Sequence, residues 1–305
     1  MPSSEPQQLR SSVVNITRRL PLVEYINLTK PAIISLLLVT ALGGVFVAAQ
    51  GVPSWQLILV VMAGGALTAG GAGALNHYLD RDIDARMRRT HRRPLVRRSL
   101  PEKHAVILGL ALNLAGFAVL YIGANLLSAL LALGASLFYI VVYTGWLKRS
   151  TAQNIVIGGA AGAMPPLIGI AAVNGRIDLS ALYLFTIVFF WTPPHFWSLS
   201  LILKEDYKRA HVPMLPVVHG EKITCWNILL YSLALLAVTI LFFSSTPRGL
   251  IYLTASVMLG ALFIWYAVRL LLKPSPSKAR QIYIYSLVYL AALFGAIMLD
   301  TVVLL

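Results

Sequence analysis

The chain has 305 residues, of which 58% are apolar and only 12% charged, and 25 Lys and Arg against 11 Asp and Glu give a net charge of +14. A soluble domain is about 45–50% apolar and about 25% charged, so this composition excludes a soluble globular enzyme, a disordered chain and a fibrous repeat. Because about 20 apolar residues cross a bilayer, the chain has room for about nine transmembrane helices.

The charge and the cysteine content narrow the functional classes further. In a membrane protein, basic residues collect in cytoplasmic loops and face anionic lipid, so the positive charge does not indicate a nucleic-acid partner. The single cysteine, Cys225, excludes an intrachain disulfide and a cysteine-based zinc or iron–sulfur site. Residues 1–30 contain no apolar stretch typical of a cleaved secretory signal, and Glu5 and Glu24 argue against a mitochondrial transit peptide.

Apolar runs bounded by Pro, Gly and charged residues predict an all-α membrane protein, with nine transmembrane helices in one bundle. The predicted spans cover approximately residues 32–50, 55–75, 104–122, 126–147, 152–173, 179–203, 226–244, 249–272 and 282–304. We therefore divide the chain into an N-terminal segment, residues 1–30, and a single transmembrane domain, residues 31–305. Glycines at close intervals in the second and fifth spans favour close helix packing.

The distribution of basic residues predicts the orientation of the bundle. With nine spans, every Lys and Arg except Arg176 and Arg248 falls on one side of the membrane. Because basic loops stay in the cytoplasm, we expect a cytoplasmic N-terminus and a C-terminus on the opposite side.

Carboxylates are concentrated in two of these basic loops, after the second and the sixth span. Asn76, Asp80 and Asp84 are spaced by four, so a helix continuing from the second span would place them on one face, with Asp82 elsewhere. Like charges at this spacing repel unless a cation binds, and Mg²⁺ is usually held by one or two carboxylates with substrate phosphates. The alternative is a solvated helix end, whose aspartates pair with Arg81, Arg86 or Arg88.

The loop after the sixth span begins with Lys204, Glu205 and Asp206 and continues with Lys208 and Arg209. Such a mixture of carboxylates and cations can hold a metal–diphosphate and neutralise its charge as a leaving group. The signal is weak alone, but a diphosphate bridged by magnesium needs both residue types, so the two loops together favour a diphosphate site.

Two further motifs allow both a functional and a structural interpretation. Arg92 and Arg93 can bind phosphate, while a basic run beside a membrane also rests on anionic lipid. Pro193 and Pro194 break a transmembrane helix, so His195 either bonds to a freed carbonyl at the kink, or contacts a haem or another reacting centre. Tyr143, Lys148, Arg149 and Asn154 are near cytoplasmic helix ends, and either line the same cavity or pack at the interface.

These motifs resemble those of the intramembrane UbiA-type prenyltransferase superfamily. Within it, the strings NHYLDRDIDARMRRTHRRPL, LKRSTAQNIVIGGAAGAMPPLIG, WTPPHFWSL and DYKRAHVPMLPVVHG resemble the protoheme IX farnesyltransferase branch, the haem O synthases. The resemblance extends from about Thr29 to Leu305. One departure is that the superfamily's second motif is usually a spaced pair such as D-x-x-x-D, whereas Asp206 is followed by Ala210 four residues on.

The resemblance implies a helical bundle around a central cavity that opens toward the cytoplasm and the lipid. It implies transfer of a farnesyl group from farnesyl diphosphate to a vinyl group of haem B, with magnesium assistance and addition of a hydroxyl, which gives haem O. The residues that it implicates in holding magnesium–diphosphate are Asn76, Asp80, Asp84 and Asp206, with Glu205 as second choice in its loop. Those implicated in contacting phosphate or lining the substrate cavity are Arg93, Lys148, Arg149, Lys208, Arg209, Tyr143 and Asn154, with His195 on the haem side.

The expected partners are farnesyl diphosphate, haem B and membrane lipid, with a haem A synthase as a candidate protein partner and no nucleic acid. The expected location is the bacterial cytoplasmic membrane, rather than the mitochondrial inner membrane. Two other functions remain open at this point. One is prenylation of a quinone precursor, and the other is haem handling by a transporter or assembly factor. A transporter typically places polar residues near the bilayer midplane, whereas most acidic residues here lie at one membrane face.

Overall fold

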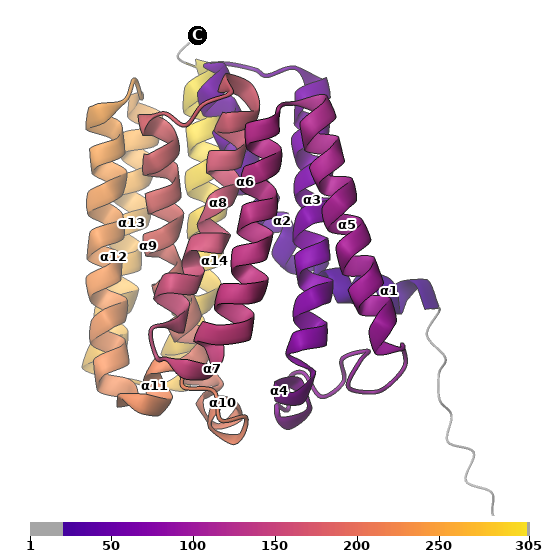
Figure 1. The fold of residues 1–305 in the computed structure, drawn as a ribbon. Helices are drawn as coiled ribbons and strands as arrows, with labels where there is room; N and C mark the ends of the chain where they lie inside the picture. The colour runs from indigo at the N-terminus through magenta and orange to yellow at the C-terminus, as the bar shows by residue number, and fades with distance from the viewer. Residues whose placement is uncertain (1–20, 304–305) are drawn as a thin grey trace, which may run out of the picture.

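The computed structural model describes residues 21–303, which contain helices and no strand (Figure 1). Arg10, Arg18, Arg19 and Glu5 lie outside the described residues. The long elements are α2 (Pro31–Ala49), α3 (Trp55–Leu79), α5 (Glu102–Gly123), α6 (Leu126–Leu137) with η1 (Phe138–Leu147) and α7 (Lys148–Ser150), α8 (Asn154–Asn174), α9 (Leu179–Ile202), α12 (Gly220–Ser245), α13 (Leu250–Leu272) and α14 (Pro276–Val303). The short elements are α1 (Pro21–Thr29), α4 (Arg81–Arg86), α10 (Lys204–Arg209) and α11 (Leu215–Val218).

Within the described residues, nine helical segments are long and apolar enough to cross a membrane, which confirms the predicted number of spans. The starts of two spans differ from the prediction. Helix α12 begins at Gly220 rather than at about 226, and α14 begins at Pro276 rather than at about 282. Both added turns are polar, so hydropathy alone does not detect them. The helices continue past the apolar segment into the loop region, where polar side chains are not penalised.

Several helix ends are set by side-chain caps. Asn125 and Asp178 accept hydrogen bonds of 2.9 Å from the backbone N–H of Ser128 and Ala181, at the starts of α6 and α9. Asp300, near the end of α14, accepts from the N–H groups of Gly249 and Tyr252 at 2.7 and 3.1 Å. A carboxylate at a helix N-terminus satisfies free donors and complements the helix dipole, so Asp300 fastens α13 to α14.

Glycines bring helix backbones into direct contact. A Cβ on Gly44 of α2 would clash with the carbonyl oxygen of Pro166 in α8, and one on Gly169 of α8 would clash with the carbonyl of Ala41. Small residues are the usual means of close helix packing in lipid, where no hydrophobic force drives helices together. The many large apolar side chains exposed on the outer faces, such as Leu114 and Ile122, fit contact with lipid.

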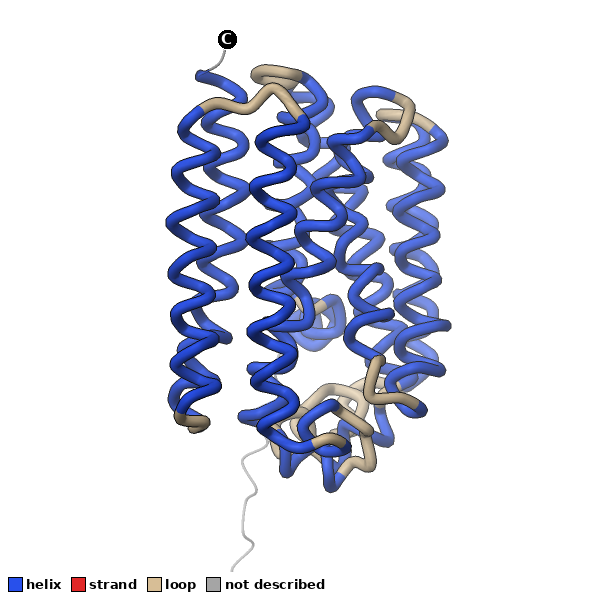
Figure 2. The backbone as a smooth tube through the Cα atoms, turned by 90° about the vertical axis from the view of Figure 1, so that its left-hand side faces the viewer, coloured by secondary structure: helices blue, strands red, loops and turns tan. Residues whose placement is uncertain are grey.

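The two ends of the bundle differ in charge. The helices run side by side along its height, and α4, α7, α10 and α11 gather at one end, which we call the basic end (Figures 1 and 2). The C-terminal end of the described chain lies at the opposite end, while α1 runs across the bundle (Figure 1). The loops that carry Arg176 and Arg248 also lie away from the basic end. This separation agrees with the predicted topology, although the membrane side of each end stays a prediction.

The expected break at Pro193 and Pro194 is wrong, because α9 is continuous from Leu179 to Ile202. A proline removes one N–H donor, and neighbouring hydroxyls or helices can satisfy the carbonyls of a transmembrane helix. Close to the prolines, Thr192 donates to the carbonyl of Val188 at 2.8 Å, and Ser198 donates to that of His195 at 2.7 Å. Helix α8 likewise continues through Pro165 and Pro166.

Candidate active site

The predicted carboxylate stripe lies where α3 passes into α4. Asp80 is the joint, the residue between the two helices, yet the i to i+4 hydrogen bonding of the backbone continues through it. Asp80 N–H donates to the backbone carbonyl of Asn76 at 2.9 Å, and Asp84 N–H donates to that of Asp80 at 2.8 Å. The side chains of Asp80 and Asp84 are only 2% and 3% exposed, whereas that of Asp82 is 54% exposed. The prediction that Asp82 faces elsewhere is therefore correct.

Each buried carboxylate has its own cation. Lys148 Nζ lies 2.6 Å from Asp80 Oδ2, and Arg93 Nη1 lies 2.6 Å from Asp84 Oδ2. The alternative pairing with Arg81, Arg86 or Arg88 is wrong, since Arg81 pairs instead with Glu102 at 3.1 Å. A buried carboxylate without a partner is strongly destabilising, so these cations keep the stripe inside the protein.

Asn76 links three elements. Its amide nitrogen donates to Asp80 Oδ2 and to Thr144 Oγ1 of η1, both at 2.9 Å. Its side-chain oxygen, Oδ1, accepts from the ammonium of Lys30. Asn76 and Lys148 both donate to Oδ2 of Asp80, so Asp80 Oδ1 is a buried carboxylate oxygen without a partner among the described residues.

Lys30 belongs to the site, although the spacing of charges did not indicate it. It joins α1 to α2 with a left-handed backbone, φ 59° and ψ 57°, which is strained for lysine and unusual before a proline. Gly73 of α3 makes room for this corner, because a Cβ there would lie 2.9 Å from the carbonyl oxygen of Thr29. Burial, together with the nearby cation of Arg93, lowers the pKa of Lys30 to about 7.

Arg149 pairs with the exposed carboxylate of the joint. It donates to both oxygens of Asp82 at 2.7 and 2.8 Å and to the carbonyl of Leu79 at 2.7 Å, on the exposed side of the joint. These hydrogen bonds lower the pKa of Asp82 to about 2. In the structure, Arg149 therefore braces the end of α3 and does not contact the buried stripe.

In the second loop, Asp206 is buried and Glu205 is exposed, which favours Asp206 as the inward-facing carboxylate. Arg209 Nη2 pairs with Asp206 Oδ1 at 2.6 Å, while Lys208 is exposed. Among the residues from 21 to 303, no group of three or more His, Cys, Asp or Glu is arranged as a ready metal site. The two loops therefore supply carboxylates separately.

An apolar cluster joins the two loops. It contains Ile83 and Met87 from the first loop and Tyr207, Val212 and Met214 from the second. Arg86 Nη1 and His211 Nδ1 also approach to 3.4 Å across the junction. Burial in this cluster raises the pKa of Tyr207. The packing of the loops against each other covers the basic end.

Tyr143 and Asn154 lie close to this junction. The ring of Tyr143 stacks on Tyr139 with centroids 5.5 Å apart and fits against the bare backbone of Gly158. Asn154 is fully buried and donates to the carbonyls of Thr151 at 2.5 Å and Pro213 at 3.4 Å. Tyr143 thus offers an aromatic wall, and Asn154 ties the second loop to α8.

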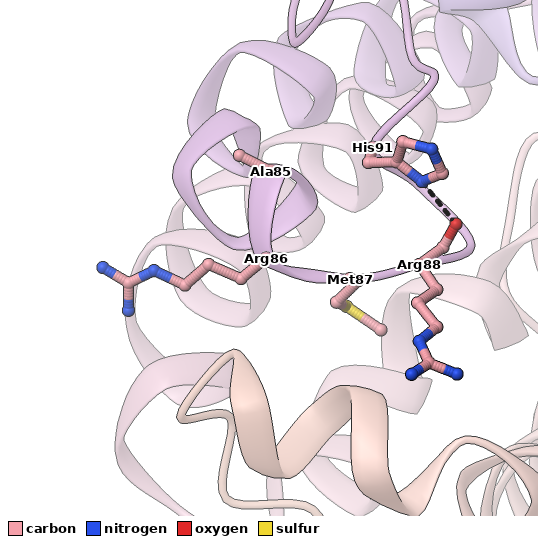
Figure 3. A pocket seen from close by; sticks show the side chains of 5 residues that line it. All are labelled: Ala85, Arg86, Met87, Arg88 and His91. Carbon is pink, nitrogen blue, oxygen red and sulfur yellow. Dashed lines mark hydrogen bonds between the residues drawn. The ribbon is translucent and has the colours of Figure 1, made fainter.

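A hollow of about 330 Å³ lies beside the joint, lined by Ala85, Arg86, Met87, Arg88 and His91 (Figure 3). His91 Nδ1 bonds to the carbonyl of Arg88 at 2.6 Å, which closes a turn of the loop. Neither Asp80 nor Asp84 lines this hollow, so it lies outside the carboxylate stripe.

His195 lies in α9 and is 8% exposed. The predicted bond to a freed carbonyl is wrong, because Nδ1 lies 2.7 Å from Ser286 Oγ of α14. Its ring packs between Trp191 and Tyr283. The imidazole therefore has a fixed position inside the bundle, between α9 and α14.

The residues present fit a bound magnesium ion. Asp80 Oδ1 is a buried oxygen without a partner among the described residues, and the side-chain oxygens of Asn76 and Asp84 are paired with a lysine and an arginine side chain rather than with backbone groups. Magnesium prefers such oxygen ligands and is usually bound through one or two carboxylates plus phosphate.

Comparisons with known proteins identify the family of the chain. The UbiA prenyltransferase family profile matches residues 37–294. The chain is 51% identical over 279 residues to a protein named protoheme IX farnesyltransferase from Symbiobacterium thermophilum, covering 91% of this chain and 93% of that protein. Proteins of the same name from Roseiflexus castenholzii and Thermus thermophilus are 48% and 49% identical over 92% of this chain. The chain spans about half the length of these two relatives, 53% and 46% respectively.

Solved structures share the fold. A digeranylgeranylglyceryl phosphate synthase has a TM-score of 0.76 at 17% identity, over 92% of this chain and 98% of that one. A UbiA homologue from Archaeoglobus fulgidus, solved with DMAPP and Mg²⁺, has a TM-score of 0.67 at 19% identity, over 90% and 99%. From the bundle, the carboxylate stripe and the extent of the family match, this chain belongs to the UbiA prenyltransferase family.

Proposed function

We propose that this protein transfers a farnesyl group from farnesyl diphosphate to a vinyl group of haem B, with addition of a hydroxyl at the same vinyl, and so forms haem O and diphosphate. The observation that carries the proposal is the buried stripe of Asn76, Asp80 and Asp84, compensated by Lys30, Lys148 and Arg93. The oxygen acceptors of the stripe suit a metal ion, and the cations around them suit phosphate groups. Together they fit a metal–diphosphate better than they fit a metal ion or a phosphate alone.

In this proposal, Asn76, Asp80 and Asp84, with Asp206 from the second loop, hold magnesium together with the diphosphate. The bound ion neutralises charge on the leaving diphosphate. Lys30, Lys148 and Arg93 then exchange their carboxylate and amide partners for phosphate oxygens, which keeps every buried charge paired. Lys208 and Arg209 supply further cations from the second loop, while Arg149 supports the joint through Asp82.

The protein also protects the reacting carbon. As the bond between C1 of the farnesyl group and the diphosphate oxygen breaks, positive charge develops on the allylic carbons. The stacked rings of Tyr139 and Tyr143 offer electron-rich faces to that charge. The apolar cluster around Ile83 and Tyr207 keeps bulk water from capturing the allylic cation before C1 bonds to the terminal vinyl carbon. That bond leaves the positive charge on the other vinyl carbon, which takes up one water molecule; loss of a proton from this water leaves the hydroxyl.

Haem B as the acceptor is supported by relatives of about 50% identity that carry the name protoheme IX farnesyltransferase. His195 belongs on the haem side of the cavity, and Asn154 shapes the cavity through the second loop. The proposed location is the bacterial cytoplasmic membrane, with the basic end in the cytoplasm and a haem A synthase as the candidate recipient of the product.

The proposal is tested with the purified full-length protein in lipid nanodiscs, supplied with farnesyl diphosphate, Mg²⁺ and haem B. Mass spectrometry should detect haem O, and chelation of the metal should abolish it. Asp80→Asn and Asp84→Asn should each reduce kcat/KM at least about 100-fold, because each removes a charged metal ligand. Asp82→Asn is the matched control, since Asp82 lies on the same helical segment but faces outward, and it should retain activity within about threefold.

Haem O formation that persists in Asp80→Asn with unchanged Mg²⁺ dependence would contradict the metal–diphosphate site. Farnesylation of a quinone precursor in place of haem B would contradict the acceptor. Movement of haem across the membrane without any prenylated product would indicate the transporter alternative.

A further inference from the structure

The fourth span changes its winding beside the carboxylate stripe. Element η1 is a π-helix, in which backbone N–H groups bond to carbonyls five residues earlier, as the N–H of Lys148 does with Tyr143. The element packs against α3 and α8. A π-helix is rare and is frequently found at a functional site, so its position next to the stripe points to a role there.

The widened turns of η1 bring both of its ends to the stripe. In an α-helix, residues nine positions apart, such as Tyr139 and Lys148, are separated by about 2.5 turns and face opposite sides. In the structure, the hydroxyl of Tyr139 lies 3.5 Å from Nζ of Lys30, and Nζ of Lys148 lies 2.6 Å from Oδ2 of Asp80. The π-helix therefore turns Tyr139 and Lys148 toward the same site, with Thr144 between them.

The hydroxyl of Thr144 is fully buried and has two partners. It donates its only hydrogen to the carbonyl of Tyr139, five residues earlier, at 2.9 Å, because a carbonyl oxygen can only accept. Oγ1 of Thr144 must therefore accept in its second contact, which is with the amide nitrogen of Asn76 at 2.9 Å. The hydroxyl thus bonds across the widened turn and fixes the side on which the NH₂ group of Asn76 lies.

The amide of Asn76 has one orientation that suits all of its neighbours. Its two N–H groups donate to Thr144 and to Asp80 Oδ2, while its oxygen faces the ammonium of Lys30, which can only donate. A flipped amide would place its oxygen against these two acceptors and its N–H groups against the ammonium. The same orientation is the one that a metal ion needs, since an amide binds Mg²⁺ through its oxygen.

We infer that Thr144 is a positioning residue of the candidate metal site, because its hydroxyl, held by the widened turn of η1, keeps the oxygen of Asn76 directed at the ion. This inference rests on the proposed function, in which Asn76 is a magnesium ligand. Without the hydroxyl, one N–H of the buried amide loses its acceptor and the side chain is free to turn. Partners that orient metal ligands typically contribute 10–100-fold to metal affinity, so loss of this one should weaken binding about tenfold.

The experiment measures metal binding without turnover. Mn²⁺ is titrated alone into the full-length protein in nanodiscs of zwitterionic lipid, and the free ion is quantified from its EPR signal. Mn²⁺ suits the same oxygen ligands as Mg²⁺. The wild-type protein should bind Mn²⁺, and Thr144→Val, which replaces the hydroxyl with a methyl group of similar size, should bind it about tenfold more weakly. Thr144→Ala removes the hydroxyl without placing a methyl group against the amide, and should give the same loss if the valine variant does not fold.

Three further variants separate positioning from a purely structural role. Thr144→Ser keeps the hydroxyl and should bind Mn²⁺ within about twofold of the wild type. Thr40→Val in α2 is the matched control, since Thr40 is also a buried threonine that donates within its own helix, to the carbonyl of Leu37 at 2.8 Å, and it should change nothing. In an Asn76→Ala background, Thr144→Val should cause no further loss, because the amide that it positions is gone.

The same wild-type sample, given farnesyl diphosphate, Mg²⁺ and haem B, reports on the proposed function separately. Haem O formation together with equal Mn²⁺ affinity in wild type and Thr144→Val would overturn the positioning role and leave the function standing. A tenfold loss that persists in the Asn76→Ala background would also overturn the positioning role. Weaker Mn²⁺ binding in Thr144→Val without haem O formation by the wild type would support the positioning role and overturn the function. Absence of Mn²⁺ binding to the wild type would overturn both.

Discussion

At the scale of single residues, the site depends on pairing buried charges without satisfying them fully. Asn76 and Lys148 donate to one oxygen of Asp80, the other oxygen has no partner between residues 21 and 303, and Lys30 donates to the side-chain oxygen of Asn76. Removing one partner of a buried ion pair costs about 3–5 kcal/mol. The cations therefore do two things, because they stabilise the protein before substrate binds and remain available to phosphate afterwards.

Lys30 allows a prediction in which two constants move in opposite directions. In Lys30→Met, no ammonium competes with Mg²⁺ for the side-chain oxygen of Asn76, so the apparent dissociation constant of Mg²⁺ should fall. One phosphate partner is also lost, so KM for farnesyl diphosphate should rise about tenfold or more. Titrating each component against haem O formation measures both constants. Lys103→Gln, an exposed lysine at the start of α5, is the control and should change neither; a parallel rise of both constants in Lys30→Met would contradict the exchange of partners.

The residues of the stripe could be predicted from the sequence, but their partners could not. A spacing of four places Asn76, Asp80 and Asp84 on one face wherever a helix continues. Lys148 lies 68 residues from Asp80, and Lys30 lies 46 residues from Asn76, so only the packing of the spans brings them together. The nearby arginines suggested local pairs instead, which the structure does not contain.

At the scale of elements, backbone contact through glycine determines how close the helices lie. Gly44 and Gly169 bring the backbones of α2 and α8 into contact, and Gly73 of α3 makes room for the corner that precedes α2. The apolar spans and their number followed from composition. The continuity of α9 through two prolines did not, since it depends on the helices α8, α12 and α14 that pack around α9.

Glycine substitutions in these helices should therefore have opposite effects at different positions. Gly44→Ala should destabilise the protein by about 1–3 kcal/mol, because the methyl group meets the backbone of Pro166. Gly162→Ala in α8 meets nothing within 4 Å and should be neutral or stabilising by about 0.5–1 kcal/mol. Thermal unfolding in detergent measures both, and equal midpoints for the two variants would contradict the contact.

At the scale of the whole molecule, the bundle combines a basic end that carries the candidate site with an opposite end that is nearly free of cations. In the proposed function the same loop would serve orientation and chemistry, since the loop after α3 holds both exposed arginines and Arg93. The distribution of Lys and Arg among the loops already predicted the one-sided charge. It could not show that an apolar cluster packs the two charged loops together, because Ile83 and Tyr207 are far apart in sequence.

The orientation can be measured with single cysteines. In a Cys225→Ser background, cysteine is introduced at Arg97, in the loop after α3, or at Arg176, between α8 and α9. If the basic end faces the cytoplasm, a membrane-impermeant maleimide added to intact cells should label Arg176→Cys alone. Arg97→Cys should react only after the membrane is opened. Labelling of Arg97→Cys in intact cells would reverse the topology.

The distance in sequence between Asp80 and Lys148 also bears on biosynthesis. A ribosome adds about 5–20 residues per second, so the 68 intervening residues take roughly 3–14 s to make. During that time Asp80 has no counter-ion from the fourth span, and the end of α3 stays at the water surface. The ion pair between Asp80 and Lys148 can therefore form only after the fourth span has been made, about halfway through synthesis of the chain.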